Sequence, residues 1–521
     1  MKWWTWPLTA CALLLASGAI AKCEPKPGLN TFFSDGWGID ADNHRLQRQT
    51  TLTRNNVQSL RLAWSYGLAN KKPRMWPLAT EDTLFIGDTG RGIVALDRNS
   101  GCERWMHSQP GEIASAILHL KIGTRTALLY LERTSGVYAI DATDGTPIWH
   151  AEVNDQPLPL YSGTPFIAGN IVYVPISSVE VALAMNPIYG CCRTSGGMAA
   201  FNAATGKKLW FRRTISSPAR QVGRHWRFVK EYGPSGAPAW AAPLYNAKRG
   251  LIYFGTGENY SRPTTNTSDA IFALAGMTGA LKWVHQFTTN DSYNTSCDVP
   301  FDHPNCRRPK GPDLDFGAPP VMVHLANNRD VLVVGQKSAD IYGLDPDNGA
   351  ILWKNRLGRG GALGGVHWGI AANEDAGLVF VPISDIEDAS HATRGSRPGL
   401  YALDAATGKI RWQHARTSRC AERNCYGGIS AAITATPDLI VAESFDGILE
   451  IYDAINGRLL WSDDSWKHYA TVNGVPASGG AYDAHGPMIA GDQIIVTSGY
   501  DSFFHKPGNA LLVYQLRKVT P

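Results

Sequence analysis

One pattern of apolar and polar positions recurs along the chain. The pattern apolar-x-Asp-x-x-x-Gly-x-x-x-Trp occurs seven times, as in ALDRNSGCERW, GLDPDNGAILW and ALDAATGKIRW. Each copy predicts a strand, a turn with glycine in the left-handed region, and a second strand that begins at the tryptophan. The copies are unequally spaced, so we expect one structural unit joined by loops of variable length. The seven tryptophans are Trp105, Trp149, Trp210, Trp283, Trp353, Trp412 and Trp461.

Repeated units of this kind predict a β-propeller of four-stranded blades. Half-repeats lie at both ends, RLAWSYGL near Trp64 and NALLVYQL at 509–516, and together they would complete an eighth blade. We therefore expect an all-β, eight-bladed propeller that forms a single domain over residues 22–521 and is closed by both ends of the chain. The alternative is seven blades with two stray strands.

The repeat also predicts which of its positions matter most. Asn202 and Ala275 replace the aspartate in two copies, whereas the glycine and the tryptophan occur in all seven. We expect each tryptophan to cover the edge of its blade by stacking onto the neighbouring blade.

Composition and charge exclude some classes of function. The chain is rich in Gly, Pro and Trp and has few long amphipathic helical patterns, which agrees with an all-β fold. Its formal net charge is only +4 and its basic residues are scattered, so nothing indicates a nucleic-acid-binding protein.

The first 21 residues are typical of a secretory signal peptide. Lys2 precedes an apolar stretch at residues 8–16, and Ala19-Ile20-Ala21 provides a small-residue cleavage site. The apolar stretch is shorter than the ~20 residues that span a bilayer. We expect an exported, periplasmic protein without a membrane anchor.

The cysteines fit an oxidising compartment. Removal of the signal peptide would remove Cys11 and leave eight of the nine cysteines. Elimination then favours a bond between the adjacent residues Cys191 and Cys192, although each could instead pair with a distant cysteine. The chain has no C-x-x-C-H motif, so it attaches no c-type haem. The other predicted pairs are Cys23–Cys102, Cys297–Cys306 and Cys420–Cys425.

The repeat and several longer segments resemble the quinoprotein alcohol dehydrogenases, which use pyrroloquinoline quinone (PQQ). The segments GPSGAPAWAAPLYNAKRGLIYFGTGENYS, GPDLDFGAPP and GRGGALGGVHWGIA are most similar to the polyvinyl-alcohol-dehydrogenase branch. The resemblance covers nearly the whole mature chain. It implies PQQ in the central channel, Ca²⁺ at its quinone end, an aspartate as general base, and a separate cytochrome c as electron acceptor. The substrates would be secondary or polymeric alcohols.

The resemblance implies a set of metal ligands and a base. It places Glu180 at one ligand position, and calcium prefers such hard oxygen ligands. Where the family has an asparagine after Gly-Thr-Gly, this chain has Glu258 followed by Asn259, so either residue could be the second ligand. Asp315 would be the general base and a further ligand, with Asp313 as the local alternative base.

The resemblance also implies residues that hold the quinone. Trp240 occupies the floor position, and the Cys191–Cys192 ring would cover the opposite face, although the family places its vicinal pair a blade earlier. Lys337 would stabilise negative charge on the reduced quinone. His367 and Trp368 would contact the cofactor or the substrate.

Propellers with this repeat also occur as non-enzymatic scaffolds in outer-membrane assembly. A binding or assembly scaffold is therefore the alternative function. A scaffold requires none of the predicted site residues, so their arrangement in space separates the two hypotheses.

Overall fold

The computed structural model describes residues 23–517 except 25, 227, 307–308, 387–394, 419–424 and 503–504. The predicted signal peptide and Cys420 lie outside the described residues. Within the described part of the chain, no helix has the length and apolar character needed to cross a membrane.

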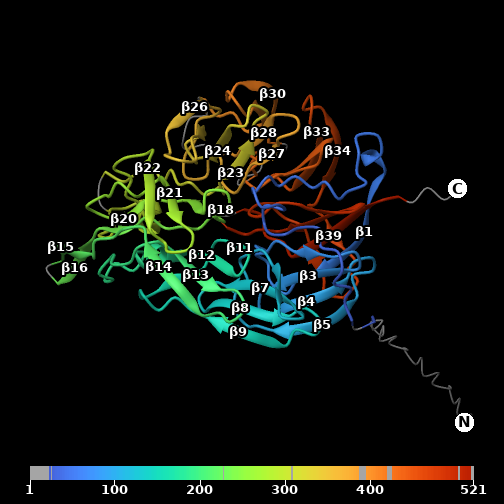
Figure 1. Cartoon of the computed structure of the whole chain (residues 1–521), viewed down its shortest axis with the longest axis horizontal. Helices are drawn as coiled ribbons and strands as arrows, with labels where there is room; N and C mark the ends of the chain where they lie inside the picture. Colours follow the sequence, from blue (N-terminus) through green and yellow to red (C-terminus); the bar gives the residue numbers. More distant parts are fainter. Residues whose placement is uncertain are drawn as a thin grey trace, which may run out of the picture.

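Seven four-stranded antiparallel sheets and one five-stranded sheet surround a central axis and form the eight blades (Figure 1). The first two blades are β2 (Leu78–Ala79), β3 (Thr83–Asp88), β4 (Gly92–Asp97), β5 (Glu103–Ser108); β6 (Leu118–Ile122), β7 (Arg125–Glu132), β8 (Gly136–Asp141), β9 (Pro147–Ala151). In the third blade β10 and β11 both pair with β12, and its strands are β10 (Pro159–Leu160), β11 (Phe166–Ala168), β12 (Ile171–Ser178), β13 (Gly197–Asn202), β14 (Lys208–Arg213). The fourth and fifth blades are β18 (Leu244–Asn246), β19 (Leu251–Gly255), β21 (Ala270–Ala275), β22 (Leu281–Gln286); β23 (Val321–His324), β24 (Asp330–Gly335), β25 (Asp340–Leu344), β26 (Ile351–Arg356).

The remaining blades complete the ring. The sixth and seventh blades are β27 (Ala371–Asn373), β28 (Leu378–Ile383), β29 (Gly399–Asp404), β30 (Ile410–Ala415); β31 (Thr434–Ala435), β32 (Leu439–Glu443), β33 (Ile448–Asp453), β34 (Leu459–Asp464). The eighth blade is β37 (Met488–Ala490), β38 (Gln493–Ser498), β39 (Ala510–Leu516) and the N-terminal β1 (Leu60–Gly67). Short elements outside the blades are β15 (Arg220–His225), β16 (Val229–Gly233), β17 (Ser235–Gly236), β20 (Asn259–Ser261), β35 (His468–Tyr469), β36 (Ala477–Ser478), α1 (Glu180–Leu183), η1 (Val57–Ser59) and η2 (Thr295–Asp298).

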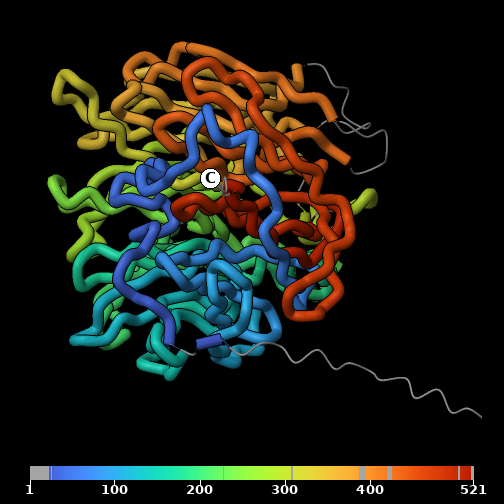
Figure 2. The backbone as a smooth tube through the Cα atoms, turned by 90° about the vertical axis from the view of Figure 1, so that its right-hand side faces the viewer, coloured from blue at the N-terminus to red at the C-terminus, as the bar shows by residue number. Residues whose placement is uncertain are grey.

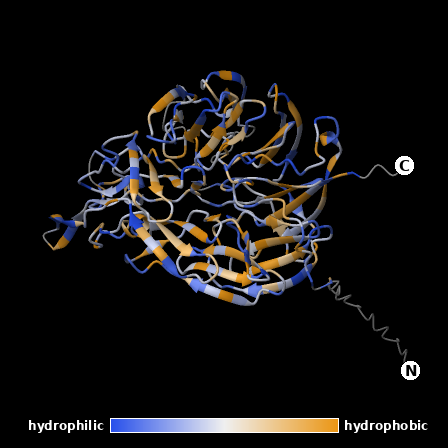
Figure 3. Ribbon diagram, viewed as in Figure 1, coloured by the Kyte–Doolittle hydropathy of each residue, from blue (hydrophilic) through white to orange (hydrophobic). Residues whose placement is uncertain are grey.

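The eighth blade confirms the predicted closure of the ring. β1 pairs with β39 in antiparallel register, from Leu60 opposite Leu516 to Gly67 opposite Ala510. Figure 2 shows these first and last parts of the chain side by side. Apolar residues are concentrated on the strands, and many polar residues lie in the connecting loops (Figure 3).

The tryptophans connect neighbouring blades as the repeat predicts. Trp283 of the fourth blade donates its indole N–H to the carbonyl of Pro346 in the fifth blade at 3.1 Å. A Cβ atom added to Gly349 would lie 2.6 Å from the same indole ring, and this glycine has φ +74. The repeat therefore requires glycine for both its conformation and its lack of a side chain. The same contact recurs at Gly101–Trp64, Gly145–Trp105, Gly206–Trp149, Gly279–Trp210, Gly408–Trp353 and Gly457–Trp412.

The two copies without aspartate keep the turn by different means. The Asn202 side-chain oxygen accepts hydrogen bonds from the N–H groups of Ala204 and Thr205, as Asp97 does from Asn99 and Ser100 in the first blade. Ala275 has no such acceptor, and its turn relies on the backbone bond from Gly279 N to its carbonyl at 2.8 Å. The backbone turn is thus sufficient without the side-chain acceptor.

We expect Gly349→Ala to lower the free energy of unfolding by about 2–4 kcal/mol, because it combines a left-handed conformation with overpacking against Trp283. Gly250→Ala is the matched control: Gly250 has φ +63, but an added Cβ atom meets nothing within 4 Å. Conformational strain alone predicts about 1–2 kcal/mol there. The urea midpoints of the two variants test the indole contact, and equal midpoints would exclude it.

A segment before the first blade packs against the seventh blade. Arg45 is fully buried and donates hydrogen bonds to the carbonyls of Ile433 at 2.7 Å and Trp37 at 3.1 Å. Its guanidinium lies 4.4 Å from the centroid of the Trp37 ring. Leu46 pairs with Ala435, so the segment is attached to the seventh blade. These contacts fix the segment to the ring of blades.

Candidate functional site

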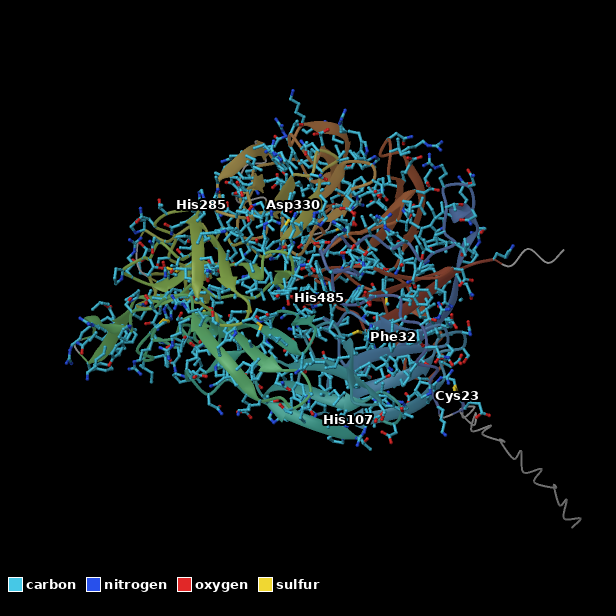
Figure 4. All side chains as sticks on the ribbon, viewed as in Figure 1. Cys23, Phe32, His107, His285, Asp330 and His485 are labelled. Carbon is cyan, nitrogen blue, oxygen red and sulfur yellow. A yellow bond between two sulfur atoms is a disulfide. The ribbon has the colours of Figure 1, made fainter. Side chains whose placement is uncertain are left out.

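Most of the predicted site residues meet in loops at the inner ends of the fourth, fifth and sixth blades. Glu258 follows β19, Asp315 precedes β23, and Lys337 follows β24. These loops join short inner strands, whose ends converge near the propeller axis. His485, labelled near the centre of the propeller in Figure 4, lies 5.8 Å from the ring of Trp368.

Asp315 is the centre of this arrangement. Its Oδ2 atom accepts hydrogen bonds from Trp240 Nε1 and Lys337 Nζ, both at 3.1 Å. Its Oδ1 atom accepts one from the backbone N–H of Glu258 at 3.1 Å. The carboxyl group is buried. The structure thus brings four predicted residues into direct contact around one carboxylate.

Lys337 is the cation at this site. Its buried ammonium also donates to Asp313 Oδ1 at 2.9 Å and lies 5.6 Å from the centroid of the Trp240 ring. Burial alone would lower the pKa of Lys337, but Asp313 and Asp315 raise it above its ordinary value. Burial would raise the pKa of Asp315, yet Lys337 and the hydrogen bonds lower it. Lys337 and Asp315 therefore form a charged pair.

Three carboxyl groups lie close enough to share one cation. Glu258, Asp313 and Asp315 each offer an oxygen, and these atoms lie within 4.8 Å of one another. Burial, followed by the charge of Asp315, raises the pKa of Glu258 well above its ordinary value. Burial also raises the pKa of Asp313 to about 7. Burial is the main cause of both shifts, and the charge of Asp315 adds to each of them.

Two further buried aspartates, Asp269 and Asp291, extend the acidic cluster. Asp291 accepts hydrogen bonds from the N–H groups of Asp313 at 3.3 Å and Leu314 at 2.9 Å, which holds the cluster loop in place. Burial raises the pKa of Asp291 to about 6. Asp269 is fully buried, and neither of its carboxylate oxygens has a hydrogen-bond partner. Such an oxygen-rich, anionic donor set suits a hard cation such as Ca²⁺.

The side chains of Glu258 and Asn259 have different surroundings. The Glu258 carboxyl group belongs to the cluster. The Asn259 amide nitrogen donates to the Ser235 carbonyl at 3.0 Å, and its oxygen accepts from the Thr265 N–H at 2.8 Å. Asn259 thus connects β20 to neighbouring backbone, whereas Glu258 faces the other acidic groups.

Glu180 has a different environment. Its Oε1 atom accepts from the Tyr189 hydroxyl at 2.6 Å, and its Oε2 atom accepts from the N–H groups of Arg193 at 2.7 Å and Thr194 at 2.6 Å. The carboxylate is buried and lies outside the three-carboxylate cluster. Its observed contacts fix the loop that follows the adjacent cysteines, and its predicted role as a ligand stays a prediction.

The predicted bond between Cys191 and Cys192 is present. The bonds Cys23–Cys102 and Cys297–Cys306 are present as well. Cys425 is disulfide-bonded, while Cys420 is outside the described residues. Cys191 and Cys192 are buried in a small cluster with Ala184 and Tyr260, whereas Trp240 packs against another cluster. The predicted cover over the cofactor stays a prediction.

Aromatic rings surround Trp240. The His367 ring lies 5.8 Å from it and the Trp368 ring 5.3 Å, both nearly perpendicular. His367 Nδ1 is 2.8 Å from Ser430 Oγ, and burial lowers the pKa of this histidine well below its ordinary value. Trp240 itself is only partly buried. It therefore offers accessible indole surface within an otherwise buried group.

A cavity of about 530 Å³ adjoins the acidic cluster. Asp313 is the cluster residue that reaches it, and the glycine-rich segment 360–364 forms part of its wall. Asp269 and Asp291 were not among the residues predicted from the sequence. An aspartate in a polar loop carries no local signal that distinguishes it from the many turn aspartates of this chain. The other polar residues that line the cavity are Tyr293, Asp298, Lys310, Arg359 and Tyr426.

Comparisons with known families agree with this geometry. Residues 35–305 match the model described as the β-propeller domain of glucose, ethanol and alcohol dehydrogenases. Residues 337–499 match the model described as outer membrane protein assembly factor BamB. The chain is 36% identical over 477 residues to a polyvinylalcohol dehydrogenase of Sphingopyxis sp. (strain 113P3), covering 89% of this chain and 72% of that protein. It is 33% identical over 492 residues to a polyvinylalcohol dehydrogenase of Pseudomonas sp., covering 92% and 75%.

Solved structures share the fold. A quinohemoprotein alcohol dehydrogenase, ADHIIG of Pseudomonas putida HK5, superposes with a TM-score of 0.69 at 16% identity over 96% of this chain and 81% of that chain. BamB of Moraxella catarrhalis superposes with a TM-score of 0.52 at 13% identity, over 88% and 99%. At these identities the structural likeness supports the fold alone. The family is shown by the sequence relatives.

Proposed function

Because this chain belongs to the PQQ-dependent β-propeller alcohol dehydrogenases, we propose that it oxidises secondary or polymeric alcohols to carbonyl compounds in the periplasm and passes the electrons to a separate cytochrome c. Alcohol oxidation with PQQ follows from the family. The polymeric substrate is supported by two relatives named polyvinylalcohol dehydrogenases. The missing C-x-x-C-H motif supports an external haem acceptor.

The observation that carries the proposal is the contact of Asp315 with Trp240, Lys337 and Glu258. The residues fit a flat quinone, because Trp240 is only partly buried and the Lys337 ammonium lies 5.6 Å from the centroid of the Trp240 ring. PQQ, when bound, supplies the two-electron acceptor for the hydride of the carbinol carbon. Trp240 and Lys337 would hold it, with Trp368 and His367 supporting the indole ring and the Cys191–Cys192 ring as the predicted cover.

Asp315 has the properties of the general base. Its ionised form is stabilised by Lys337, so it can accept the hydroxyl proton when the carbinol carbon loses hydride. Trp240 and the Glu258 N–H fix the orientation of the carboxylate. Because the group is buried, its charge acts in a region of low dielectric.

Glu258, Asp313 and Asp315 would hold the metal ion, which we propose to be Ca²⁺. Their oxygens already lie within 4.8 Å of one another, and calcium binds such carboxylate sets in flexible geometry. A cation would offset the burial and the charge of Asp315 that together raise the pKa of Glu258 and Asp313. The alternative role, a non-catalytic scaffold, is suggested by the match of residues 337–499 to the BamB model, but it gives this buried acidic cluster no purpose.

Reconstitution tests the proposal. Purified protein loaded with PQQ and Ca²⁺ should reduce a redox dye when supplied with butan-2-ol or polyvinyl alcohol. Removal of Ca²⁺ with a chelator should abolish turnover and should also weaken PQQ binding, measured by the absorbance of bound PQQ. Re-addition of Ca²⁺ should restore both. Failure of the protein to bind PQQ with Ca²⁺ present would contradict the proposal and favour the scaffold.

A further inference from the structure

The β15–β16 hairpin belongs to no blade and projects from the propeller beside the third and fourth blades (Figure 1). Trp226 and Phe228 lie at its tip with 53% and 67% of their surface exposed, and their ring centroids are 6.5 Å apart. Val222 on β15 is 46% exposed. Large apolar side chains gathered at one exposed tip indicate a surface that binds something.

Two neighbouring loops extend this apolar surface. Ile188 and Phe301 are 64% and 62% exposed, and Met185 is also exposed. We call these three side chains, together with Val222, Trp226 and Phe228, the apolar ridge.

Hydrogen bonds tie the segments of the apolar ridge together. His225 Nε2 on the hairpin lies 3.2 Å from the Pro187 carbonyl. His303 Nε2 lies 3.1 Å from the Met185 carbonyl, and the His303 and Phe301 rings are 6.4 Å apart. The backbone of Cys192 bonds to Tyr232 of β16, so the hairpin is also fixed to the disulfide loop. The three loops that carry the apolar ridge are therefore held next to one another.

Unpaired cations border the apolar ridge. Arg220, Arg224 and Lys230 are exposed, and within the part of the chain that the structure describes none has a side-chain hydrogen bond or ion pair. Arg224 lies opposite Lys230 across the hairpin. Like charges at paired positions disfavour the hairpin, so stability does not explain them. Their N–H groups are donors available to an acceptor outside the protein.

One loop that carries the apolar ridge also lines the cavity. Cys297 and Cys306 close the loop that carries Phe301. Asp298 of the same loop lines the 530 Å³ cavity beside Asp313. A chain that leaves the cavity over this loop would meet Phe301 first and then the other residues of the apolar ridge.

We propose that the apolar ridge binds the part of a polymeric polyol that lies outside the cavity; this inference rests on the proposed function. A cavity of about 530 Å³ holds only a short piece of a long chain, so the rest must run over the surface. The methylene groups of the polymer would pack on Trp226, Phe228 and Phe301. Its hydroxyl oxygens would accept hydrogen bonds from Arg220, Arg224 and Lys230.

The test compares a long and a short substrate. In the double variant Trp226→Ser/Phe228→Ser, the KM for polyvinyl alcohol is expected to rise about tenfold, because truncated aromatic anchors commonly cost this much affinity. The kinetic constants for butan-2-ol should stay unchanged. The control is Met277→Ser/Ile455→Ser, which removes side chains that are 70% and 60% exposed in outer turns of other blades. This control should behave as wild type with both substrates.

A direct binding measurement separates this inference from the proposed function. Polyvinyl alcohol binding to the chain without PQQ, measured by calorimetry, should weaken in the Trp226→Ser/Phe228→Ser variant even if no alcohol is turned over. Because the polymer is neutral, binding should change little between low and high salt. Unchanged polymer affinity in the variant would overturn the inference. A second result would also overturn it: the wild type binds phosphatidylglycerol vesicles in a salt-sensitive way, and the variant loses this binding but keeps its affinity for the polymer. The surface would then be a membrane contact.

Discussion

Asp315→Asn is expected to lower the turnover number for butan-2-ol by about 10²–10⁴-fold, the usual contribution of a positioned general base. The substitution removes the carboxylate that accepts the hydroxyl proton and keeps a side chain of nearly the same volume. It also leaves at least one of the donors Trp240 Nε1, Lys337 Nζ and Glu258 N facing an amide N–H. Dye reduction by protein loaded with PQQ and Ca²⁺ gives the measurement.

Asp313→Asn is the matched control for this prediction. Asp313 shares Lys337 and the acidic cluster with Asp315, but among the described residues the hydrogen bond of the Trp240 indole goes to Asp315 and not to Asp313. We expect Asp313→Asn to weaken Ca²⁺ binding and to recover turnover at high Ca²⁺ concentration. Asp315→Asn should keep its lowered turnover number at any Ca²⁺ concentration, and its retained PQQ absorbance would show that the cofactor is bound. Recovery of Asp315→Asn, together with an inactive Asp313→Asn, would transfer the role of the base to Asp313.

The fold could be predicted from the sequence because its information is local and repeated. In each copy the glycine adopts a left-handed turn and contacts the tryptophan of the preceding blade, as Gly349 does with Trp283. Both residues are visible in the sequence at fixed spacing. The eighth blade was predictable for the same reason, since Trp64 contacts Gly101 in the way the other tryptophans contact their glycines.

The site was predictable only where a motif fixes a side chain relative to a strand end. Trp240, Glu258, Asp315 and Lys337 follow or precede short inner strands, and they meet as the resemblance implies. Asp269 and Asp291 reach the cluster from other loops. Loop paths are set by tertiary packing, so the sequence shows neither how close these two aspartates lie to the cluster nor that Glu180 accepts hydrogen bonds from Arg193 and Thr194.

The adjacent cysteines show the same limit of prediction from sequence. Their bond followed from counting cysteines, and it is present. Their surroundings depend on an insertion between β12 and β13 that packs on β16 through Tyr232. The insertion also places Arg193 over the Tyr232 ring, with its guanidinium 3.9 Å from the centroid. The disulfide loop, the hairpin and the carboxylate of Glu180 thus form one unit whose position only the three-dimensional structure defines.

Lys337→Met is expected to lower the free energy of unfolding of the metal-free protein by about 3–5 kcal/mol, the usual cost of leaving buried charges without their partner. The Lys337 ammonium lies 2.9 Å from Asp313 Oδ1 and 3.1 Å from Asp315 Oδ2, and all three groups are buried. Methionine keeps the length of the side chain and removes the charge. Urea unfolding at neutral pH gives the measurement.

Lys354→Met is the control, because the Lys354 ammonium lies 3.1 Å from Asp340 but its side chain is half exposed. An exposed pair of this kind contributes only about 0–1 kcal/mol. Ca²⁺ bound by Glu258, Asp313 and Asp315 would replace part of the charge that Lys337→Met removes. Added Ca²⁺ should therefore stabilise the Lys337→Met variant more than the wild type, and it should leave the difference between Lys354→Met and wild type unchanged. Equal stabilisation of all three proteins would mean that the cation binds away from these carboxylates, because a cation within the cluster must respond to the loss of its neighbouring charge.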